Sequence, residues 1–507
     1  MTTNKIISLD DLSNHCNDKK KKKKTIVLCH GVFDLMHLGH IKYFEEAKNF
    51  GDTLIVTITP DKHVRRGPGR PVFKAEQRAE AIAALEVVDY VAINEWSTAI
   101  KTIKLLKPDY YVKGPDYNNH DNDVTGNIKL EEEAVKKYGG DIKYTSAITF
   151  SSTKLINENF DILSAPQKEY IEKIRKRYSY DEVMEYFDKM MTQNILLIGE
   201  TIIDEYIPCN ALGKAGKDPI MTLQKLEGEK YPGGVLAIAN HLAEFSNSVN
   251  IVSYLGEARQ YEDYISNNLK QGITVDAISK SNSPTIQKRR YLDIEKKNKI
   301  IGVYDINDTD INEEEENDLL DLLAEKIGQA DVVIVADYGH GLLTNKVIDY
   351  IIQHAQYLCV NTQLNSANIG FHTISKYHKI DYVCMHEGEL RHDFRSRYRN
   401  TEDLTKDLYN RVKARLVTVT QGNRGAICYD ANEGFEHSPA FASKIVDKVG
   451  AGDTLYALTA LAFSVNMPHD VALLLGSIAA TETVAAIGNS KSLDKKTMFK
   501  MLETVLK

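Results

Sequence analysis

Two histidines near the start of the chain are spaced to act on one substrate. His37 and His40 flank Gly39 in the segment HLGH, which follows the apolar run TIVLC and Gly31 and opens an amphipathic stretch. A helix that begins here presents unpaired backbone N–H groups and the positive end of its dipole, which favours a bound anion. The glycine lets a phosphate approach the backbone, and two imidazoles can stabilise charge on a bridging oxygen during phosphoryl or nucleotidyl transfer. A helix cap or surface histidines with this spacing by chance are the alternative interpretation.

A second candidate centre lies in the segment KIVDKVGAGDTLYALTALAF, where an extended stretch passes into a helix through Gly450, Ala451, Gly452 and Asp453. Such a turn of small residues exposes consecutive N–H groups that can hold an anion. The neighbouring carboxylate can take the proton of an attacking hydroxyl, so the segment suits phosphoryl transfer to an alcohol. For Asp453 alone, a helix N-cap is the alternative.

The elements that must position these residues alternate along the chain. Short β-branched runs (TIVLC, TLIVTIT, YVAI, YYVK) are separated by amphipathic stretches, and the same alternation resumes at NILLIGETIIDEY. Strands that alternate with helices predict parallel, doubly wound sheets. We therefore predict an α/β protein with two such domains, in this order: a flexible Lys-rich leader over 1–24, a first domain over 25–156, a helical linker over 157–193 and a second domain over 194–507.

The composition is that of a folded, soluble protein. Of 507 residues, 43% are hydrophobic and 26% are charged, and the formal net charge is −8. Such a chain offers no cationic field, so we expect neither nucleic acid nor a membrane as a partner. The six cysteines form no CxxC pair, which fits a reducing cytoplasm rather than a zinc site or a disulfide framework. No stretch of 18 apolar residues and no apolar segment of a signal peptide is present, so we expect no export.

The string GVFDLMHLGH resembles the signature of the nucleotidyltransferase (cytidylyltransferase-like) superfamily. The segments RPVFKAEQR, YYVKGPDY and TFSSTKLI follow in that superfamily's order, and the resemblance covers about Thr25 to Ile156. It implies a Rossmann-like domain in which His37, His40 and Lys113 act in catalysis. It implies nucleotide binding by Gly31, Phe33, Gly39, Ser151, Ser152 and Thr153.

The nucleotide used by this domain follows from two of these segments. VKGPDY together with SSTKLI looks more like the adenylyltransferase half of the bifunctional heptose kinase/adenylyltransferases than like the cytidylyltransferases. The resemblance therefore favours ATP, with CTP as the alternative. Ser151, Ser152 and Thr153 also fit a helix N-cap, a role that is compatible with phosphate binding.

The segment KIVDKVGAGDT resembles the GAGD motif of the ribokinase-like sugar kinases, and the likeness spans about Asn194 to Lys507. It implies a domain with a small β lid, Asp453 as the base, and Mg²⁺ positioned with the help of Glu389. Nucleotide binding is implied for Gly450, Ala451, Gly452, Thr420, Gly422 and Gly425. Sugar or sugar-phosphate binding is implied for Asp204, Gly233, Gly234, Lys288, Arg290 and Asp337.

Three positions depart from the pattern of these kinases. His386 stands where the NxxE element has asparagine, Ala237 stands where an asparagine usually follows the glycine pair, and His340 stands where the heptose kinases usually have lysine in DYGKG. These departures put the metal affinity and the identity of the sugar in doubt. A kinase domain that binds its ligand without turnover is therefore one alternative.

Both halves together resemble the bifunctional heptose kinase/adenylyltransferases in the reverse order. We expect an enzyme of nucleotide-sugar formation that uses ATP and Mg²⁺, phosphorylates a sugar or sugar phosphate, and transfers a nucleotidyl group to a sugar 1-phosphate. Its partners would be sugar phosphates and nucleoside triphosphates, and it would form a homo-oligomer, a dimer through the kinase lid. A cytidylyltransferase fused to a polyol or sugar kinase is the other enzymatic alternative.

Overall fold

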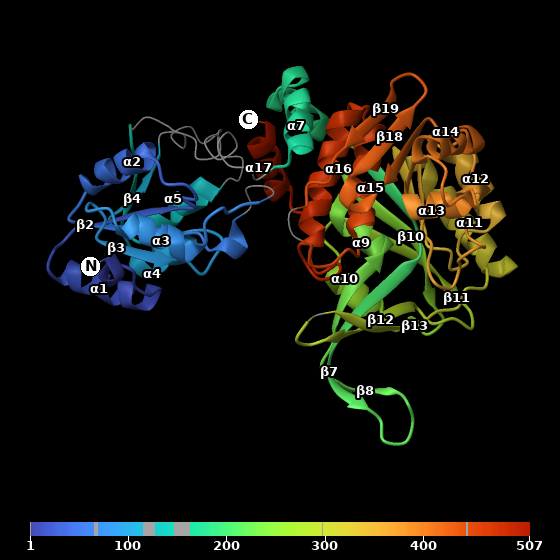
Figure 1. The fold of residues 1–507 in the computed structure, drawn as a ribbon, viewed down its shortest axis with the longest axis horizontal. Helices are drawn as coiled ribbons and strands as arrows, with labels where there is room; N and C mark the ends of the chain where they lie inside the picture. Colours follow the sequence, from blue (N-terminus) through green and yellow to red (C-terminus); the bar gives the residue numbers. More distant parts are fainter. Residues whose placement is uncertain are drawn as a thin grey trace. The chain divides into compact units, whose positions relative to one another are not determined.

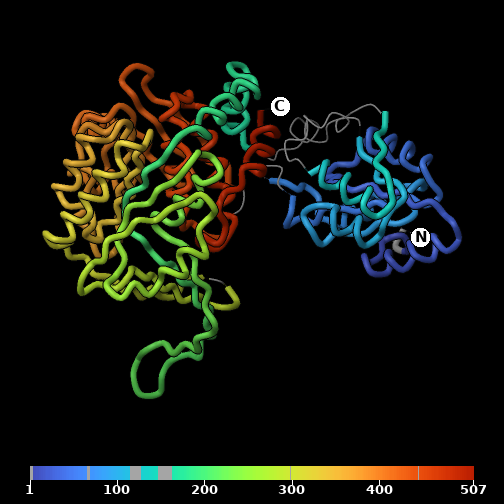
Figure 2. Tube along the Cα trace, turned by 180° about the vertical axis from the view of Figure 1, so that it is seen from behind, coloured from blue at the N-terminus to red at the C-terminus, as the bar shows by residue number. Residues whose placement is uncertain are grey.

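The computed structural model describes residues 2–64, 69–114, 127–146, 163–296, 298–442 and 445–506. It divides into two compact units, Met1–Ser164 with Phe499–Lys507, and Ala165–Met498, and each unit is described by itself (Figures 1 and 2). None of the helices in the described ranges combines the length and the apolar character that crossing a bilayer would require.

The first unit is built on a five-stranded sheet in the order β3-β2-β1-β4-β5, and every neighbouring pair is parallel. The strand order reverses between β1 and β4, and ligands of open parallel sheets bind outside the carboxyl ends of the strands at such a point. The strands are β1 (Ile26–Gly31), β2 (Thr53–Ile58), β3 (Tyr90–Ile93), β4 (Tyr110–Lys113) and β5 (Asp141–Tyr144). The helices are α1 (Leu9–Lys21), α2 (Leu38–Lys48), α3 (Ala75–Ala83), α4 (Ile100–Leu106) and α5 (Asn127–Lys137).

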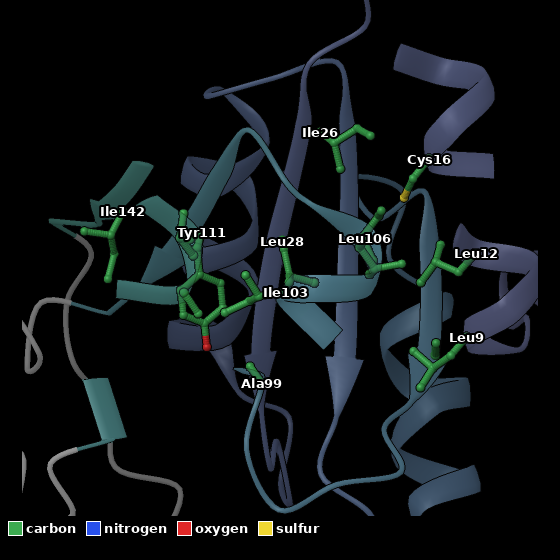
Figure 3. Close-up of a cluster of buried hydrophobic side chains, with 14 of the residues drawn as sticks. Leu9, Leu12, Cys16, Ile26, Leu28, Ala99, Ile103, Leu106, Tyr111 and Ile142 are labelled. Carbon is green, nitrogen blue, oxygen red and sulfur yellow. The ribbon is translucent and has the colours of Figure 1, made fainter. Parts of the chain in front are cut away.

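The expectation of a flexible leader is wrong for the residues of α1. The Ser8 side chain accepts a hydrogen bond from the Asp11 amide at 3.1 Å and caps the helix. Leu9, Leu12 and Cys16 share one face of α1 and are buried in the core of the unit, where Figure 3 shows them directed towards Leu106 and the sheet. The spacing of these three residues is helical, so the apolar face outweighs the run of lysines that dominates the composition of this segment.

The second unit is built on a nine-stranded sheet in the order β11-β10-β6-β14-β15-β16-β17-β18-β19. The pairs are parallel as far as β17, and the last three strands form antiparallel hairpins. The strands are β6 (Asn194–Gly199), β10 (Ser248–Gly256), β11 (Ile273–Lys280), β14 (Val332–Asp337), β15 (Leu358–Thr362), β16 (Tyr382–His386), β17 (Leu416–Thr420), β18 (Ala426–Asp430) and β19 (Gly434–Ser438).

A separate five-stranded sheet accompanies the large one, in the order β13-β12-β7-β8 with β9 paired to β7. Its strands are β7 (Thr201–Lys214), β8 (Met221–Lys225), β9 (Glu229–Gly234), β12 (Ile286–Asp293) and β13 (Lys299–Asp305). Strand β7 is buried where it leaves β6 and exposed at its far end, where it forms the projecting hairpin with β8 (Figure 1). We call this second sheet the lid sheet.

Helices cover both faces of the nine-stranded sheet. Helices α9, α15 and α16 pack together on one face, and α11, α12, α13 and α14 lie on the other (Figure 1). The helices of this unit are α7 (Ala165–Arg177), α8 (Tyr180–Met190), α9 (Val235–Leu242), α10 (Glu262–Asn268), α11 (Glu313–Lys326), α12 (Asn345–His354), α13 (Glu387–Asp393), α14 (Thr401–Val412), α15 (Ala451–Ser464) and α16 (His469–Val484). The last helix, α17 (Lys495–Leu506), begins in this unit, and its residues from Phe499 onwards are counted with the first unit. The prediction of two α/β units with parallel sheets is confirmed.

The described part of the segment predicted as a helical linker is helical, but it packs as part of the second unit. The Tyr170 hydroxyl donates to the Asp470 carbonyl at 2.9 Å, and Arg177 forms an ion pair of 2.6 Å with the Asp470 carboxylate. Phe187 of α8 lies against Phe245, and α8 packs on α15. The outer faces of α7 and α8 carry many charged residues, so the sequence pattern did not indicate that their other faces are buried.

Candidate active sites

The first candidate site lies where β1 ends, beside the point at which the strand order reverses. Phe33 takes a left-handed backbone conformation with φ of 50°, which turns the chain from β1 towards α2. A Cβ on Gly31 would lie 2.8 Å from the Phe33 ring, so a larger residue here would require that ring to move. The Phe33 ring packs edge-on against His40 and also against Phe44. Phe33 therefore supports a histidine of the site from the core side.

His37 and His40 lie together, as their spacing predicts. Their rings stack with centroids 3.9 Å apart and an interplanar angle of 19°. His37 is the N-cap residue of α2, and Gly39 is buried in the first turn of that helix. Burial lowers the pKa of both rings, to about 4 for His40, where the neighbouring His37 adds to the effect. Near neutral pH both rings are therefore neutral N–H donors rather than cations.

Lys113, predicted to act on phosphate, is held by an acid that the sequence analysis did not single out. Its ammonium forms an ion pair of 3.0 Å with Glu131 of α5, which is buried. Glu131 also accepts hydrogen bonds from the Tyr111 hydroxyl at 2.8 Å and from the Ala99 amide at 3.1 Å. Burial alone would raise the pKa of Glu131, but Lys113, with His30 and the Ala99 amide, keeps it lowered. The pair fixes a cation at the carboxyl end of β4, the strand next to β1.

Two further charged residues shape the loops around this site. Arg78 is buried and donates to the Thr59 carbonyl at 3.0 Å and to the Asp61 carboxylate at 2.6 Å, and it also reaches the Val32 carbonyl. Asp34 accepts from the Val72 amide at 2.8 Å. Arg78 and Asp34 thereby tie the loops after β1 and β2 together. The predicted nucleotide ligands Ser151, Ser152 and Thr153 lie outside the described residues.

The second candidate site lies at the start of α15. Gly450 caps this helix with φ of 85°, and a Cβ there would lie 2.3 Å from Asn489 Oδ1. Ala451 and Gly452 complete the first turn. Asp453 follows them, and burial, with the nearby Asp204, raises the pKa of its carboxyl to about 6. The Tyr338 hydroxyl donates to Asp453 Oδ1 at 3.4 Å.

Asp204 and Arg290 form the part of this site that comes from the lid sheet. They form an ion pair, and the Asn489 side chain donates to Asp204 Oδ2 at 3.3 Å. A Cβ on Gly233 would lie 2.6 Å from Asp204 Oδ2, so the glycine pair leaves room for this carboxylate. Gly234 has φ of 55°, and a Cβ there would meet the Glu200 carbonyl at 2.4 Å.

Lys288 lies beside this pair, opposite Asp204 in the parallel register of β12 and β7. Its side chain is buried, and its ammonium stands 5.9 Å from the centre of the Tyr338 ring and 5.8 Å from that of Tyr304. Burial lowers the pKa of Lys288, against the attraction of Asp204. The structure thus brings the predicted residues Asp204, Lys288, Arg290 and Asp453 into one site.

Two buried acids, Glu200 and Asp337, lie beneath the loop that carries Tyr338. Glu200 is fully buried and accepts from the amides of Tyr338 and His340, both at 2.9 Å. Burial and the nearby Asp337 raise the pKa of Glu200 to about 7. Asp337, a predicted sugar ligand, is buried among Lys376 at 2.7 Å and the Tyr377 hydroxyl at 2.7 Å. Both acids therefore position the loop after β14, which carries Tyr338.

Glu389 and His386 cap the short helix α13. Glu389 accepts from the His386 amide at 2.7 Å and from the Leu364 amide at 3.1 Å. His386 Nδ1 accepts from the Gly388 amide at 3.0 Å. The imidazole thus supplies the acceptor that an asparagine carbonyl would supply at an N-cap, so this departure preserves the local backbone. Burial raises the pKa of Glu389 to about 7, and the Asp453 carboxylate adds to this shift.

The glycine element after β17 lies next to α13. Thr420, the last residue of β17, is paired in register with His386, and its hydroxyl donates to the Met385 carbonyl at 3.5 Å. Gly422 and Gly425 both have positive φ, and a Cβ on Gly425 would lie 1.9 Å from the Ser438 carbonyl oxygen. The turn is therefore closed to larger residues. Ala237, the departure after the glycine pair, is buried in the first turn of α9.

The chain matches two family models. Residues 192–496, which are more than half of the chain, match the model described as pfkB family carbohydrate kinase. Residues 28–159 match the model described as Cytidylyltransferase-like. The two ranges follow the second and first units closely.

Curated relatives match the first part of the chain. Bifunctional protein HldE of Geobacter metallireducens is 38% identical over 151 residues, which are 29% of this chain and 29% of that protein. Bifunctional protein HldE of Sulfurimonas denitrificans is 50% identical over 100 residues, which are 19% of this chain and 21% of that protein. The matched part thus spans less than a third of the length of either relative.

Solved structures resemble the second part. Phosphofructokinase-2 from Escherichia coli in complex with fructose-6-phosphate superposes with a TM-score of 0.51 and 16% identity, covering 62% of this chain and 100% of that chain. The same enzyme in complex with potassium gives 0.50 and 16% over the same shares. At this identity the likeness shows the fold alone. The predicted fold, a Rossmann-like first domain and a ribokinase-like second domain, is confirmed.

Proposed function

This chain belongs to the pfkB family of carbohydrate kinases, and from that premise we propose that it is a bifunctional enzyme of nucleotide-sugar synthesis. A nucleotidyltransferase-like domain is fused to the sugar kinase domain. In our proposal the kinase domain phosphorylates a heptose-like sugar or sugar phosphate with ATP. The first domain then transfers a nucleotidyl group, AMP in preference to CMP, to a sugar 1-phosphate and releases pyrophosphate.

The observation that carries the kinase proposal is the environment of Asp453. Its carboxyl has a pKa of about 6 and stands at the start of α15, where helix N–H groups favour an anion. Asp204, Lys288 and Arg290 lie around it. In the proposed step Asp453 takes the proton of a sugar hydroxyl, the hydroxyl oxygen attacks the γ-phosphorus of ATP, and ADP leaves.

The acids of the second site fit a divalent cation. The Asp453 carboxylate adds to the raised pKa of Glu389, and a cation bound at Glu389 would relieve that repulsion. Oxygen ligands of this kind suit Mg²⁺. We propose that Glu389 helps to hold Mg²⁺ with the nucleotide. When bound, Mg²⁺ neutralises charge on the phosphates during transfer.

For the first domain we propose that a sugar-phosphate oxygen attacks the α-phosphorus of the nucleotide. His37 and His40 would donate hydrogen bonds to the departing pyrophosphate, and Lys113 would add positive charge from the carboxyl end of β4. The stacked imidazoles and the Lys113–Glu131 pair support this assignment.

The choice of nucleotide can be tested directly. With a matched sugar 1-phosphate and Mg²⁺, pyrophosphate release is expected to be faster with ATP than with CTP. The measurement is the initial rate of pyrophosphate formation with each nucleotide at equal concentration. A clear preference for CTP contradicts the adenylyl assignment and supports the cytidylyltransferase alternative.

The pH dependence of sugar phosphorylation tests the role of Asp453. The base must be ionised to accept a proton, and its raised pKa means that the ionised fraction is lost as the pH falls through about 6. The rate is expected to fall by roughly tenfold for each pH unit below that value and to be level above it. Initial rates between pH 5 and pH 8, at saturating Mg²⁺, measure this profile. A rate that stays level down to pH 5 contradicts the assignment.

The lid sheet supports a proposal about assembly. Leu212, Ile220 and Met221 are large apolar side chains exposed near the tip of the β7–β8 hairpin. We propose a homodimer formed through this sheet. A ligand-binding domain without turnover is the second candidate for the kinase half, and the replacements at His386 and Ala237 favour it.

A further inference from the structure

Three buried polar atoms without hydrogen-bond partners lie around the second site: Tyr264 Oη, His340 Nε2 and Asn489 Oδ1. A fourth such atom in the described part of the second unit, Thr418 Oγ1, lies instead in the core, on β17 beside Tyr382 and Cys428. Asn489 donates to Asp204 through its other side-chain atom, and the charge of Asp204 also acts on Tyr264. Buried polar atoms in native proteins almost always have a partner, so this concentration indicates a polar ligand.

His340 is almost fully buried, with 1% of its surface exposed. Its Nδ1 lies 2.6 Å from Asp308 Oδ1. An ionised carboxylate only accepts hydrogen bonds, so this contact assigns the ring proton to Nδ1 and leaves a lone pair on Nε2. Burial, and next the nearby Lys288 ammonium, lower the pKa of His340 to about 4, so the ring is neutral near pH 7. The orphaned atom is therefore an acceptor.

The Lys288 ammonium supplies the complementary group. Its side chain is 7% exposed, and within the described ranges it forms no ion pair and donates no hydrogen bond. Its contacts are with the rings of Tyr304 and Tyr338. A buried ammonium without an acceptor is costly, so its protons need a ligand oxygen. The charge of Lys288 acts on the His340 ring, so the donor protons and the lone pair belong to one site.

A hydroxyl group satisfies both requirements, because it donates one hydrogen bond and accepts others. A phosphoryl or carboxylate oxygen does not, because it has only lone pairs to offer to Nε2. We propose that His340 Nε2 accepts, and Lys288 Nζ donates, a hydrogen bond to one non-reacting hydroxyl of a polyhydroxylated sugar, which makes His340 a specificity-determining residue of the kinase domain. This inference rests on the proposed kinase function.

The backbone explains why this hydroxyl is fixed relative to the reacting one. Glu200 holds the amides of Tyr338 and His340, and Tyr338 contacts the proposed base Asp453. One buried carboxylate thus sets the distance between the base and the His340 ring. A sugar that lacks the recognised hydroxyl, or carries it with the other stereochemistry, would leave Nε2 unpaired next to a buried cation.

The test compares His340→Ala and His340→Gln with the wild-type protein on the best sugar of a hexose and heptose panel and on its set of monodeoxy analogues. The exposed His354 on α12 supplies the control variant His354→Ala. For the wild type, one analogue is expected to raise KM by roughly tenfold, the value of one buried hydrogen bond. His340→Ala is expected to raise KM for the complete sugar by a similar factor, to leave kcat within a few-fold, and to lose discrimination against that analogue alone.

Two results overturn the inference. One is a variant that discriminates among all analogues as the wild type does, which means that His340 binds a water molecule only. The other is a fall in kcat with unchanged KM, which means that His340 acts on the base rather than on the sugar. Thermal unfolding of both variants shows whether either has a folding defect. If His340→Ala has one, the KM values of His340→Gln are compared with those of the wild type instead. If the wild type phosphorylates no sugar, the kinase proposal fails, and calorimetric binding of the same sugars to the same variants still tests His340.

Discussion

Asp453→Asn is expected to slow sugar phosphorylation by roughly 10²- to 10⁴-fold, the usual contribution of a general base. The amide keeps the size of the side chain and an acceptor for the Tyr338 hydroxyl, so the start of α15 should keep its structure. It cannot accept the proton of a sugar hydroxyl near neutral pH. The loss should therefore appear in kcat, with little change in the KM for the sugar.

The measurement is ADP formation that depends on the sugar, followed with the complete chain. Asp407→Asn is the matched control, because Asp407 lies on the surface of α14 in an ion pair with Arg399. Nucleotidyl transfer by Asp453→Asn should equal that of the wild type. Wild-type phosphorylation by Asp453→Asn would remove Asp453 from the mechanism and favour the ligand-binding alternative for this domain.

His37→Ala and His40→Ala are each expected to slow nucleotidyl transfer by roughly 10²- to 10³-fold, as the loss of one donor to a developing charge does. The lowered pKa values make both rings neutral, so each contributes an N–H group rather than a full charge. Because the rings stack, each variant also removes a contact that orients the other ring. The double variant should therefore lose less than the product of the two single effects.

Pyrophosphate release with a sugar 1-phosphate measures these effects. His15→Ala is the matched control in the same unit, because His15 is exposed on α1, where its ring contacts the Asp11 carbonyl and Tyr90. Sugar phosphorylation should be unchanged in all three variants. Transfer at the wild-type rate in both single variants would contradict the assignment of the histidine pair.

The local order of the elements could be predicted from the sequence. Alternating β-branched runs and amphipathic stretches predict parallel sheets, and the structure has them. A turn of small residues that opens a helix was predicted at Gly450, and Gly450 caps α15 with a positive φ. These features depend on residues close in sequence, which is why the pattern of a short segment is sufficient to predict them.

The sequence also misled where one property dominated a segment. Lysines concealed the apolar face of α1, and the charged outer faces of α7 and α8 concealed the side chains that pack on the second unit. Asp337 follows a strand and was predicted to bind sugar, but Lys376 and Tyr377 surround its carboxylate. For α1, for α7 and α8, and for Asp337, the residues that they contact in the folded structure lie far away in the sequence.

The sequence by itself determined which chemical groups this protein has and in which turns they stand: the histidine pair on either side of Gly39, and the aspartate after Gly450. Only the tertiary structure decided what surrounds them. Glu200 and the Tyr338 amide that it accepts from are 138 residues apart, and Asp204 and Arg290 are 86 apart. Such contacts depend on which strands become neighbours in a sheet, and burial there shifts the pKa of Asp453 to about 6 and leaves His340 with an unpaired acceptor. A local pattern carries no information on these distances, because the free energy that sets them comes from packing the whole domain.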